Sequence, residues 1–233
     1  MNSGDVRIAF PRTVASELVG TSTPLGIVRA GSGNGLAREL GIPPDPKQAL
    51  VNALTGRDRA VDAGQIEGRR FFNVAGIGFD AAIAADFNRL GGERRGPLRY
   101  AGVVARALFG YGAAHYSIAV DGRQLETDAL LVAIANLSQY GSNAVIAPGA
   151  RPDDGLLDVI VVGTRGVAGR IGLVVRAFTG TIDRAAGVTR LPATHVVVRA
   201  GQPIPFHVDG EPHQGGTTVE ARIWPAAIRV RVR

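Results

Sequence analysis

A glycine-rich turn between an apolar segment and an amphipathic segment constrains this chain more than any other feature. Residues 26–43 have the sequence GIVRAGSGNGLARELGIP. Glycines let the backbone turn sharply and approach a ligand closely, because no Cβ intrudes. The amides around Gly33 to Gly35 would point at an anion near the start of the following helix, and Ser32 can add a hydroxyl donor. The pattern predicts a strand, a phosphate-binding turn and a helix; a plain strand-to-helix turn is the alternative.

The segments on either side of this turn alternate between helix and strand patterns. Prolines after the first helix and before the second mark where one stops and the next starts. Such alternation is typical of α/β proteins. The predicted elements are a helix over 13–19, a strand over 25–28, a helix over 34–40 and a helix from Pro46 to Gly56.

The rest of the chain has the pattern of a β-rich domain. Runs of β-branched residues are separated by Asp-Gly and Gly-Gly pairs, which predict antiparallel strands and hairpins. Short strands are expected over 59–66 and 70–74, and helices over 81–90, 98–109 and 167–178. The final AAIRVRVR alternates apolar and basic residues, as in a strand with one wet face.

Composition narrows the class of protein. The chain has 233 residues and no cysteine, which excludes disulfides, thiolate metal sites and cysteine nucleophiles. The net charge is +6, and Lys47 is the only lysine. Scattered arginines with few aromatics favour phosphorylated ligands or anionic membranes over nucleic acid. No apolar run is long enough to cross a bilayer and no signal-peptide pattern opens the chain, so we expect a cytoplasmic protein.

Two carboxylates flank a glycine in FHVDGEPH, residues 206–213. Asp209 and Glu211 could hold a metal, orient a hydroxyl or take its proton. A plain hairpin is the alternative, since Asp-Gly is a common turn pair. His207 and His213 would suit zinc, but no further ligand has suitable spacing.

Two further segments could meet ligands. In APGARPDDGLLDVIVV, residues 147–162, loop carbonyls and a carboxylate from Asp153 or Asp154 would suit Mg²⁺ or Ca²⁺. In GGERRGPLRY, residues 91–100, three arginines could meet lipid headgroups or a substrate phosphate. A solvated turn and a solvated loop are the alternatives. The three arginines are Arg94, Arg95 and Arg99.

The order and spacing of these segments resemble the diacylglycerol kinase catalytic-domain family, which includes bacterial lipid kinases and sphingosine kinases. RAGSGNGLAR resembles the family's nucleotide loop, P-x-G-[ST]-G-N-[DG]-x-A-R, with Arg29 where proline is usual. RRGPLRY, NLSQYGSNAVIAPGARPDDGLLDV and VDGEP resemble further family motifs in the same order. The resemblance covers residues 14–233.

This resemblance implies a truncated Rossmann-like α/β nucleotide lobe followed by a β-sandwich domain with a few helices. The expected bounds are 1–57 with 225–233 for the nucleotide lobe, and 58–224 for the β-sandwich. It also implies transfer of the γ-phosphoryl group of ATP to a lipid hydroxyl, with Mg²⁺ shielding the phosphates. Such catalysis is mostly positioning and charge neutralisation.

The resemblance also implies roles for particular residues. Glu211 matches the proton acceptor, and Asp209 is a candidate for that role or for binding Mg²⁺-ATP. A structural Mg²⁺ site would use the Asp154 carboxylate and the main-chain carbonyls of Arg151 and Leu156. The nucleotide phosphates would be contacted by Gly31, Ser32, Gly33, Asn34 and Gly35.

The chain departs from the family at one motif. The family's GGDGT segment would fall near residues 6–10, which are VRIAF here. We therefore expect a shortened ATP lobe and reduced catalysis. A catalytically inactive, lipid-binding member that could dimerise is one alternative, and an NAD-kinase-like enzyme is another; VDGEP and DDGLLDV favour the lipid branch. The expected partner is a lipid, met through peripheral contact with a membrane.

Overall fold

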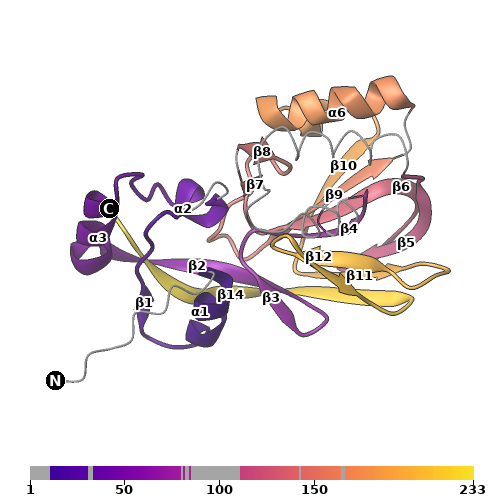
Figure 1. The fold of residues 1–233 in the computed structure, drawn as a ribbon. Coiled ribbons are helices and arrows are strands. Elements are labelled where there is room, and N and C mark those ends of the chain that lie inside the picture. Colours follow the sequence, from indigo (N-terminus) through magenta and orange to yellow (C-terminus); the bar gives the residue numbers. More distant parts are fainter. Residues whose placement is uncertain are drawn as a thin grey trace.

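Three short helices gather at one end of the protein, and strands make up most of the remainder (Figure 1). The computed structural model describes residues 11–30, 34–79, 81, 84, 111–141, 143–163 and 166–233. The helices are α1 (Pro11–Leu18), α2 (Gly35–Glu39), α3 (Pro46–Thr55) and α6 (Val167–Thr179), with a 3₁₀ turn, η2 (Ile182–Arg184). These confirm the predicted helices over 13–19, 34–40, 46–56 and 167–178. Apart from residues 81 and 84, the predicted helices over 81–90 and 98–109 and the arginine loop over 91–100 lie outside the described residues.

The strands form one large, mostly antiparallel sheet. Its order along the main path is β13-β12-β4-β6-β5-β11-β14-β2-β3; β1 also pairs with β14, and β9 pairs with both β6 and β10. The strands are β1 (Pro24–Leu25), β2 (Arg57–Ile66), β3 (Arg69–Phe71), β4 (Val74–Gly78), β5 (Ala114–Val120), β6 (Arg123–Ala135), β9 (Leu157–Gly163), β10 (Val188–Ala193), β11 (His195–Arg199), β12 (Pro205–Val208), β13 (Glu211–Gln214) and β14 (Thr218–Val232). A separate pair joins β7 (Gln139–Gly141) to β8 (Ala144–Val145).

Three hairpins are closed by two-residue turns whose second residue is glycine. The pairs are Glu67–Gly68, Asp121–Gly122 and Asp209–Gly210, and both residues of each pair have positive φ. Two positive φ values define the turn type that matches the natural twist of paired strands, and glycine adopts them without steric cost. The Asp-Gly signal in the sequence therefore predicted two of these three turns, and the third is a Glu-Gly pair.

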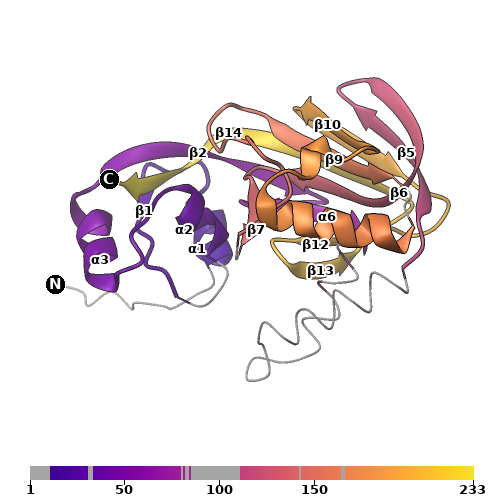
Figure 2. The same ribbon diagram turned by 90° about the horizontal axis from the view of Figure 1, so that it is seen from above.

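Two long strands join the helical end to the sheet. β2 pairs with β14 from Ala221 to Val232, with a bulge between Trp224 and Ile228, and the two strands run between the two ends of the molecule in both views (Figures 1 and 2). Beyond the bulge β14 takes β1 as a parallel neighbour, Pro24 opposite Arg229. The strand predicted over 25–28 is shorter, because only Pro24 and Leu25 pair there. The bounds of the two expected domains stay a prediction.

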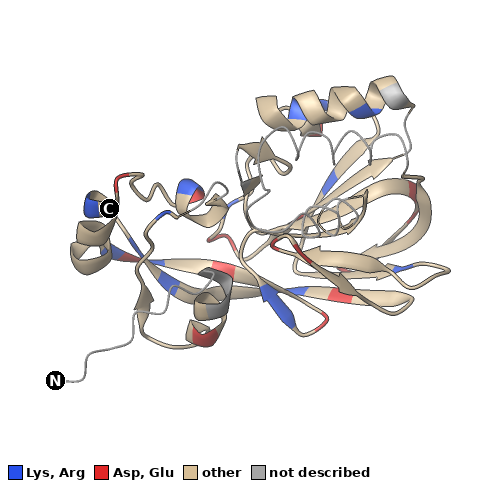
Figure 3. Cartoon of the chain, viewed as in Figure 1, with Lys and Arg blue, Asp and Glu red and all other residues tan. Residues whose placement is uncertain are grey.

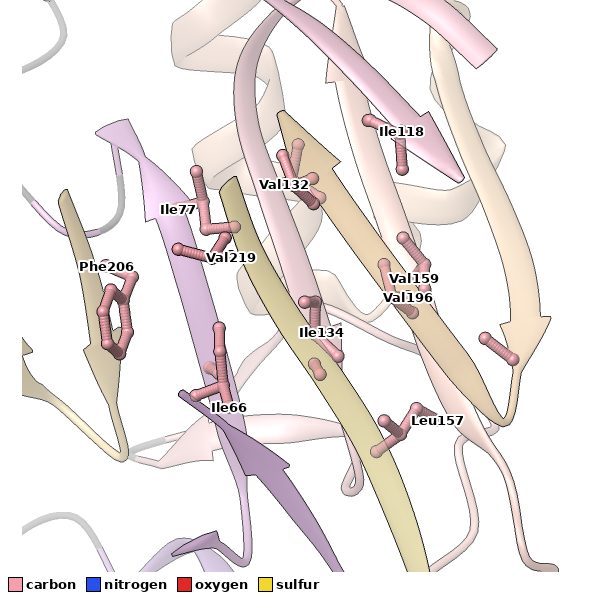
Figure 4. Close-up of a cluster of buried hydrophobic side chains, with 14 of the residues drawn as sticks. Ile66, Ile77, Ile118, Val132, Ile134, Leu157, Val159, Val196, Phe206 and Val219 are labelled. Atoms are coloured by element: carbon pink, nitrogen blue, oxygen red, sulfur yellow. The ribbon is translucent and has the colours of Figure 1, made fainter. Parts of the chain in front are cut away.

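Buried apolar side chains form three clusters. The largest fills the space between the inner faces of the curled sheet and includes Ile77, Val132 and Phe206 (Figure 4). A second lies under α1, α2 and α3 and includes Ile42 and Val230. The third lies between α6 and the sheet. An α/β part and a curled β part are thus both present, as the sequence predicted. Within the part of the chain that the structure describes, no helix has the length and apolar character needed to cross a membrane.

Candidate active site

The VDGEP motif forms the tip of the β12–β13 hairpin. Asp209 and Gly210 make the turn, with φ of 50° and 86°, and Val208 pairs with Glu211 across it. Glycine is suited to the second position because it has no Cβ to clash at positive φ. The turn sets the two predicted carboxylates, Asp209 and Glu211, on either side of Gly210.

The Asp209 carboxylate is bound by three main-chain amides. Its Oδ2 accepts from Phe72 N at 2.9 Å, and its Oδ1 accepts from Asn73 N at 2.9 Å and Val74 N at 3.1 Å. The Asp209 amide in turn donates to the Val74 carbonyl at 3.0 Å. Burial raises the pKa of this carboxyl, while the amide hydrogen bonds oppose that rise. With both oxygens bound to the backbone between β3 and β4, Asp209 fixes the position of the turn.

Glu211 has a different environment from Asp209. Its side chain is 56% exposed, and its Oε2 lies 3.8 Å from His213 Nε2. An exposed carboxylate on a fixed hairpin can accept a proton from a group that arrives from solvent. Of the two carboxylates, Glu211 is therefore the more exposed to solvent.

The two histidines beside the motif support the hairpin. His207 is buried, and its Nδ1 accepts from the Gly210 amide at 3.2 Å. Its ring lies 5.9 Å from that of Tyr140, and the His213 ring lies 5.5 Å from that of Phe206. Among the described residues no group of three or more His, Cys, Asp or Glu side chains could hold a metal. These contacts favour the hairpin interpretation over zinc.

The described part of the glycine loop lies beside the strands that support Asp209. Gly31, Ser32 and Gly33 lie outside the described residues, whereas Asn34 and Gly35 are described. Asn34 has φ of 50° and precedes α2. Asn34 is thus left-handed directly before the helix, and α2 confirms the helix that the sequence predicted from this position.

Gly35 lies close to the side chain of Asn73, one of the residues that bind Asp209. A Cβ on Gly35 would lie 3.1 Å from Asn73 Nδ2 and 3.2 Å from the Tyr140 carbonyl oxygen. The Asn73 amide meanwhile donates to Asp209. Asn73 therefore brings together the glycine loop and the carboxylate hairpin, which lie at opposite ends of the sequence.

The segment after β6 holds α2 in this position. Glu39 Oε2 accepts from Ser138 Oγ at 2.6 Å and from Gln139 Nε2 at 3.3 Å. Asn136 is buried, and its Nδ2 donates to the carbonyls of Asp62 and Phe72 at 2.9 and 3.0 Å. The NLSQYG motif thus serves to dock the glycine loop helix against the β3–β4 backbone.

Replacing Gly35 with alanine tests this close contact. Because the added methyl group needs Asn73 or Tyr140 to move, we expect Gly35→Ala to lower the free energy of unfolding by about 1–2 kcal/mol. Gly112→Ala is the matched control, since a Cβ at Gly112 meets nothing within 4 Å. Urea denaturation measures both. Equal stabilities for the two variants would contradict the close approach of α2 to Asn73.

The predicted metal loop is held by its own hydrogen bonds. Asp154 Oδ1 accepts from the Leu156 amide at 3.1 Å, and Arg151 Nη2 lies 3.4 Å from Asp153 Oδ1. Asp154 and Leu156 are exposed. One carboxylate and two main-chain carbonyls are hard oxygen donors of the kind that Mg²⁺ takes. The donor chemistry of Arg151, Asp154 and Leu156 thus suits the ion, and the site itself stays a prediction.

A buried aspartate not singled out from the sequence anchors this loop. Asp62, on β2, is only 3% exposed. Its Oδ2 accepts from the Gly155 amide at 2.8 Å and its Oδ1 from the Ala226 amide at 2.7 Å. Its carbonyl accepts from Asn136. A lone aspartate within the apolar run AVDAG was the only sequence signal for this role.

An ion pair beside the loop predicts a pH effect. The Arg59 guanidinium donates to Asp153 Oδ2 at 2.8 Å and holds the pKa of that carboxyl below its usual value. The pKa of Asp153 is lower in the folded protein than in the unfolded chain. The ion pair therefore stabilises the fold at pH values above the unfolded-state pKa, and this stabilisation is lost as pH falls through the folded-state pKa. We expect Arg59→Gln to move the Asp153 titration to higher pH. NMR titration of the carboxyl carbons measures this, with Asp183 as the internal control; an unmoved Asp153 midpoint would refute the pairing.

Comparison with known proteins identifies the two parts of the chain. Residues 11–66 match the family model described as the diacylglycerol kinase catalytic domain. Residues 73–232 match the model described as the YegS C-terminal NAD kinase beta sandwich-like domain. The models therefore cover both the glycine loop and the carboxylate hairpin.

Relatives over most of the chain carry lipid kinase names. A probable YegS-like lipid kinase from Pseudomonas aeruginosa is 30% identical over 215 residues, which cover 89% of this chain and 68% of that protein. A diacylglycerol kinase from Mycobacterium tuberculosis is 31% identical over 189 residues, which cover 77% of this chain and 60% of that one. This chain thus spans about two thirds of their length.

A solved structure shares the fold. The crystal structure of a diacylglycerol kinase from Bacillus anthracis aligns with a TM-score of 0.68 at 17% identity, covering 92% of this chain and 69% of that one. That structural likeness supports the fold alone, while the family models and the relatives support membership. The chain belongs to the family of diacylglycerol kinases and YegS-like lipid kinases.

Proposed function

We propose that this protein transfers the γ-phosphoryl group of ATP to the hydroxyl of diacylglycerol, sphingosine or a related lipid. Membership of the lipid kinase family supports the reaction class. The observation that carries the proposal is the meeting of Gly35 and Asp209 at Asn73. A phosphotransferase needs the phosphate donor and the acceptor hydroxyl in one place, and this contact puts the two motifs within one residue of each other.

In this proposal the two carboxylates have separate tasks. Glu211 takes the proton of the lipid hydroxyl as that oxygen attacks the γ-phosphorus, because its carboxylate is exposed at the hairpin. Asp209 is a positioning residue, since its oxygens are bound to three amides. It holds the turn so that Glu211 keeps its position relative to the glycine loop.

ATP would be held by the glycine loop. Gly31, Ser32, Gly33, Asn34 and Gly35 would contact its phosphates, by the family resemblance, with the acceptor hydroxyl approaching from the hairpin side. Asn73 Oδ1 is buried and has no hydrogen-bond partner in the described part of the chain. A buried acceptor beside Gly35 fits a hydroxyl or amino group of a bound nucleotide, because burying it unpaired is costly.

Magnesium has two proposed places. With ATP it would neutralise the charge of the phosphates, which is its usual contribution to phosphoryl transfer. In the loop before β9 it would be held by the Asp154 carboxylate and the carbonyls of Arg151 and Leu156. Asp62 and Asn136 connect that loop to Phe72, which binds Asp209. The loop ion would therefore stabilise the support of the hairpin.

The proposed site would lie where the two expected domains meet. Under the expected bounds, Gly35 falls in the nucleotide lobe over 1–57, and Asn73 and Asp209 fall in the β-sandwich over 58–224. We propose that the contact between Gly35 and Asn73 is the closed side of the cleft between these lobes. The returning segment 225–233 ties the lobes together through its pairing with β2.

Transfer of label from γ-labelled ATP tests the proposed function. The protein is incubated with Mg²⁺ and, separately, with diacylglycerol, sphingosine or NAD. Label on a lipid supports the proposal. Label on NAD would replace it with an NAD-kinase-like activity. Lipid binding with no label on any acceptor would instead indicate a catalytically inactive lipid-binding member.

A further inference from the structure

The bulge in β14 lies where that strand passes from the curled β part of the fold to the α/β part. Trp224 pairs with Ala63 and Ile228 pairs with Val61, so the three residues between Trp224 and Ile228 lie opposite Asp62 alone. Before the bulge β14 contributes to the first apolar cluster, and after it to the second. Since a bulge bends its strand, the backbone here sets the direction in which β14 enters the α/β part.

One residue of the bulge has a conformation that alanine rarely adopts. Ala226 has φ of 49°, in the left-handed region, where the Cβ makes the backbone less stable. Its amide donates to Asp62 Oδ1 at 2.7 Å. Such a conformation persists where the surrounding contacts fix it. The Asp62 carboxylate supplies one of those contacts.

The second oxygen of this carboxylate binds the loop before β9. Asp62 Oδ2 accepts from the Gly155 amide at 2.8 Å, and the Asp62 amide donates to the Pro152 carbonyl at 2.7 Å. Pro225, in the bulge, lies beside this loop, because a Cβ on Gly155 would be 3.9 Å from Pro225 Cγ. A single carboxylate thus joins the bulge of β14 to the loop.

Asp62 differs from the other acidic residues of the two long strands. β2 and β14 carry both acidic and basic residues (Figure 3). Asp58 pairs with Arg231, and Glu220 pairs with Arg222; the two acidic side chains are 34% and 41% exposed. Asp62 is buried, and both of its oxygens accept from main-chain amides. Exposed ion pairs contribute little, whereas removing a buried acceptor leaves its donors unpaired, so Asp62 constrains the backbone more strongly.

Contacts lead from Asp62 to both motifs of the candidate active site. Asn136 Nδ2 donates to the carbonyls of Asp62 and Phe72, and the Phe72 amide donates to Asp209. In the other direction, β14 pairs beyond its bulge with β1, which leads into the glycine loop. Asp62 therefore lies at the junction between the supports of the two motifs.

We propose that Asp62 is a positioning residue that fixes the orientation of the glycine loop relative to the carboxylate hairpin. By binding the bulge and the loop before β9 together, its carboxylate holds β14 in one direction between the two parts of the fold. Without it, β14 can adopt other directions at the bulge. The inference rests on the proposed function in one respect: phosphoryl transfer needs its donor and acceptor groups in a constant arrangement.

Distances between two spin labels test the proposal without any turnover. The chain has no cysteine, so Leu50→Cys on α3 and Gln124→Cys on β6 place one label in each part; both positions are exposed. Double electron–electron resonance without nucleotide is expected to give a narrow distribution of distances. Asp62→Asn should widen the distribution and shift its mean, because the NH₂ group that replaces one oxygen cannot accept from an amide.

Two control variants separate positioning from stability. Asp158→Asn changes another buried carboxylate, whose partner Arg190 lies on β10. Like Asp62→Asn, it should lower the urea midpoint, but it should leave the label distances unchanged. Ala226→Gly removes the Cβ and keeps the amide that Asp62 binds. It should also leave the label distances unchanged.

Unchanged distances in folded Asp62→Asn protein would overturn the proposal, and so would equal widening in either control variant. Circular dichroism confirms folding, and Asp62→Ser is the second variant, with the same widening expected. Widened distances in the Asp62 variants without phosphoryl transfer by the wild type would keep the positioning role and reject the kinase. Normal transfer by the wild type with unchanged distances in those variants would keep the kinase and reject the positioning role.

Discussion

Asp209→Asn is expected to lower the free energy of unfolding by about 2–3 kcal/mol, because an amide group would face a buried main-chain donor. The asparagine oxygen could still accept from Asn73 and Val74, but its NH₂ group would point at the Phe72 amide. Asparagine tolerates the left-handed conformation at this position, where φ is 50°, as well as aspartate does. The loss therefore reports on the hydrogen bonds and not on backbone strain. Urea denaturation provides the measurement.

The β5–β6 hairpin offers a matched control for this substitution. Asp121 also precedes a glycine in a two-residue turn, with φ of 46°. Its carboxylate also accepts three kinds of hydrogen bond, from Thr194 N, Thr194 Oγ1 and His195 N. Asp121 is exposed, so in the asparagine variant water can accept the hydrogen bond that the carboxylate no longer accepts. We expect Asp121→Asn to cost less than about 1 kcal/mol; equal losses at the two turns would show that Asp209 has no special supporting role.

Glu211→Gln is expected to slow phosphoryl transfer to the lipid by about 10²–10⁴-fold, the usual contribution of a general base. Glutamine keeps the size of the side chain but cannot accept the proton of the attacking hydroxyl. Because Glu211 is exposed at the hairpin tip, we expect the free energy of unfolding of the variant to differ from that of the wild type by less than about 0.5 kcal/mol. Label transfer from γ-labelled ATP and urea denaturation, made on the same preparation, separate the two effects.

A carboxylate away from the hairpin controls for the change of charge. Glu126 lies on β6 and pairs with His115 and Ser117 across to β5. Glu126→Gln removes the same charge and is expected to leave the transfer rate within about twofold of the wild type. A Glu211→Gln variant that retains wild-type transfer would remove Glu211 from the proposed chemistry.

Local sequence signals predicted much of the fold. The proline and glycine punctuation around α3 gave its start at Pro46 and its end at Gly56, where Asp45 caps the first turn. Asp-Gly pairs gave the turns of the β5–β6 and β12–β13 hairpins, because these two residue types readily adopt positive φ. The sequence also predicted that Asp209 and Glu211 lie close together, because the two-residue turn Asp209–Gly210 leads directly into Glu211.

Long-range contacts could not be predicted in this way. Asn73 brings the glycine loop and the hairpin together through its amide and its side-chain position, and any residue type but proline could supply such an amide. The role of Asp62 could not be predicted from its apolar strand segment. Its partners are the main-chain amides of Gly155 and Ala226, which lie far along the chain. The different environments of Asp209 and Glu211 likewise depend on which backbone lies behind the turn.

The claim that the glycine loop and the carboxylate hairpin form one nucleotide site can be tested most directly by amide NMR. A non-hydrolysable ATP analogue is titrated with Mg²⁺ while the amides of Gly35, Asn73 and Gly210 are followed. Gly122, in the equivalent turn of the β5–β6 hairpin, is the reference. Shifts at all three site amides with a single apparent Kd, and none at Gly122, are the predicted result. Shifts confined to Gly35, or no shift at any of these amides, would contradict a shared site.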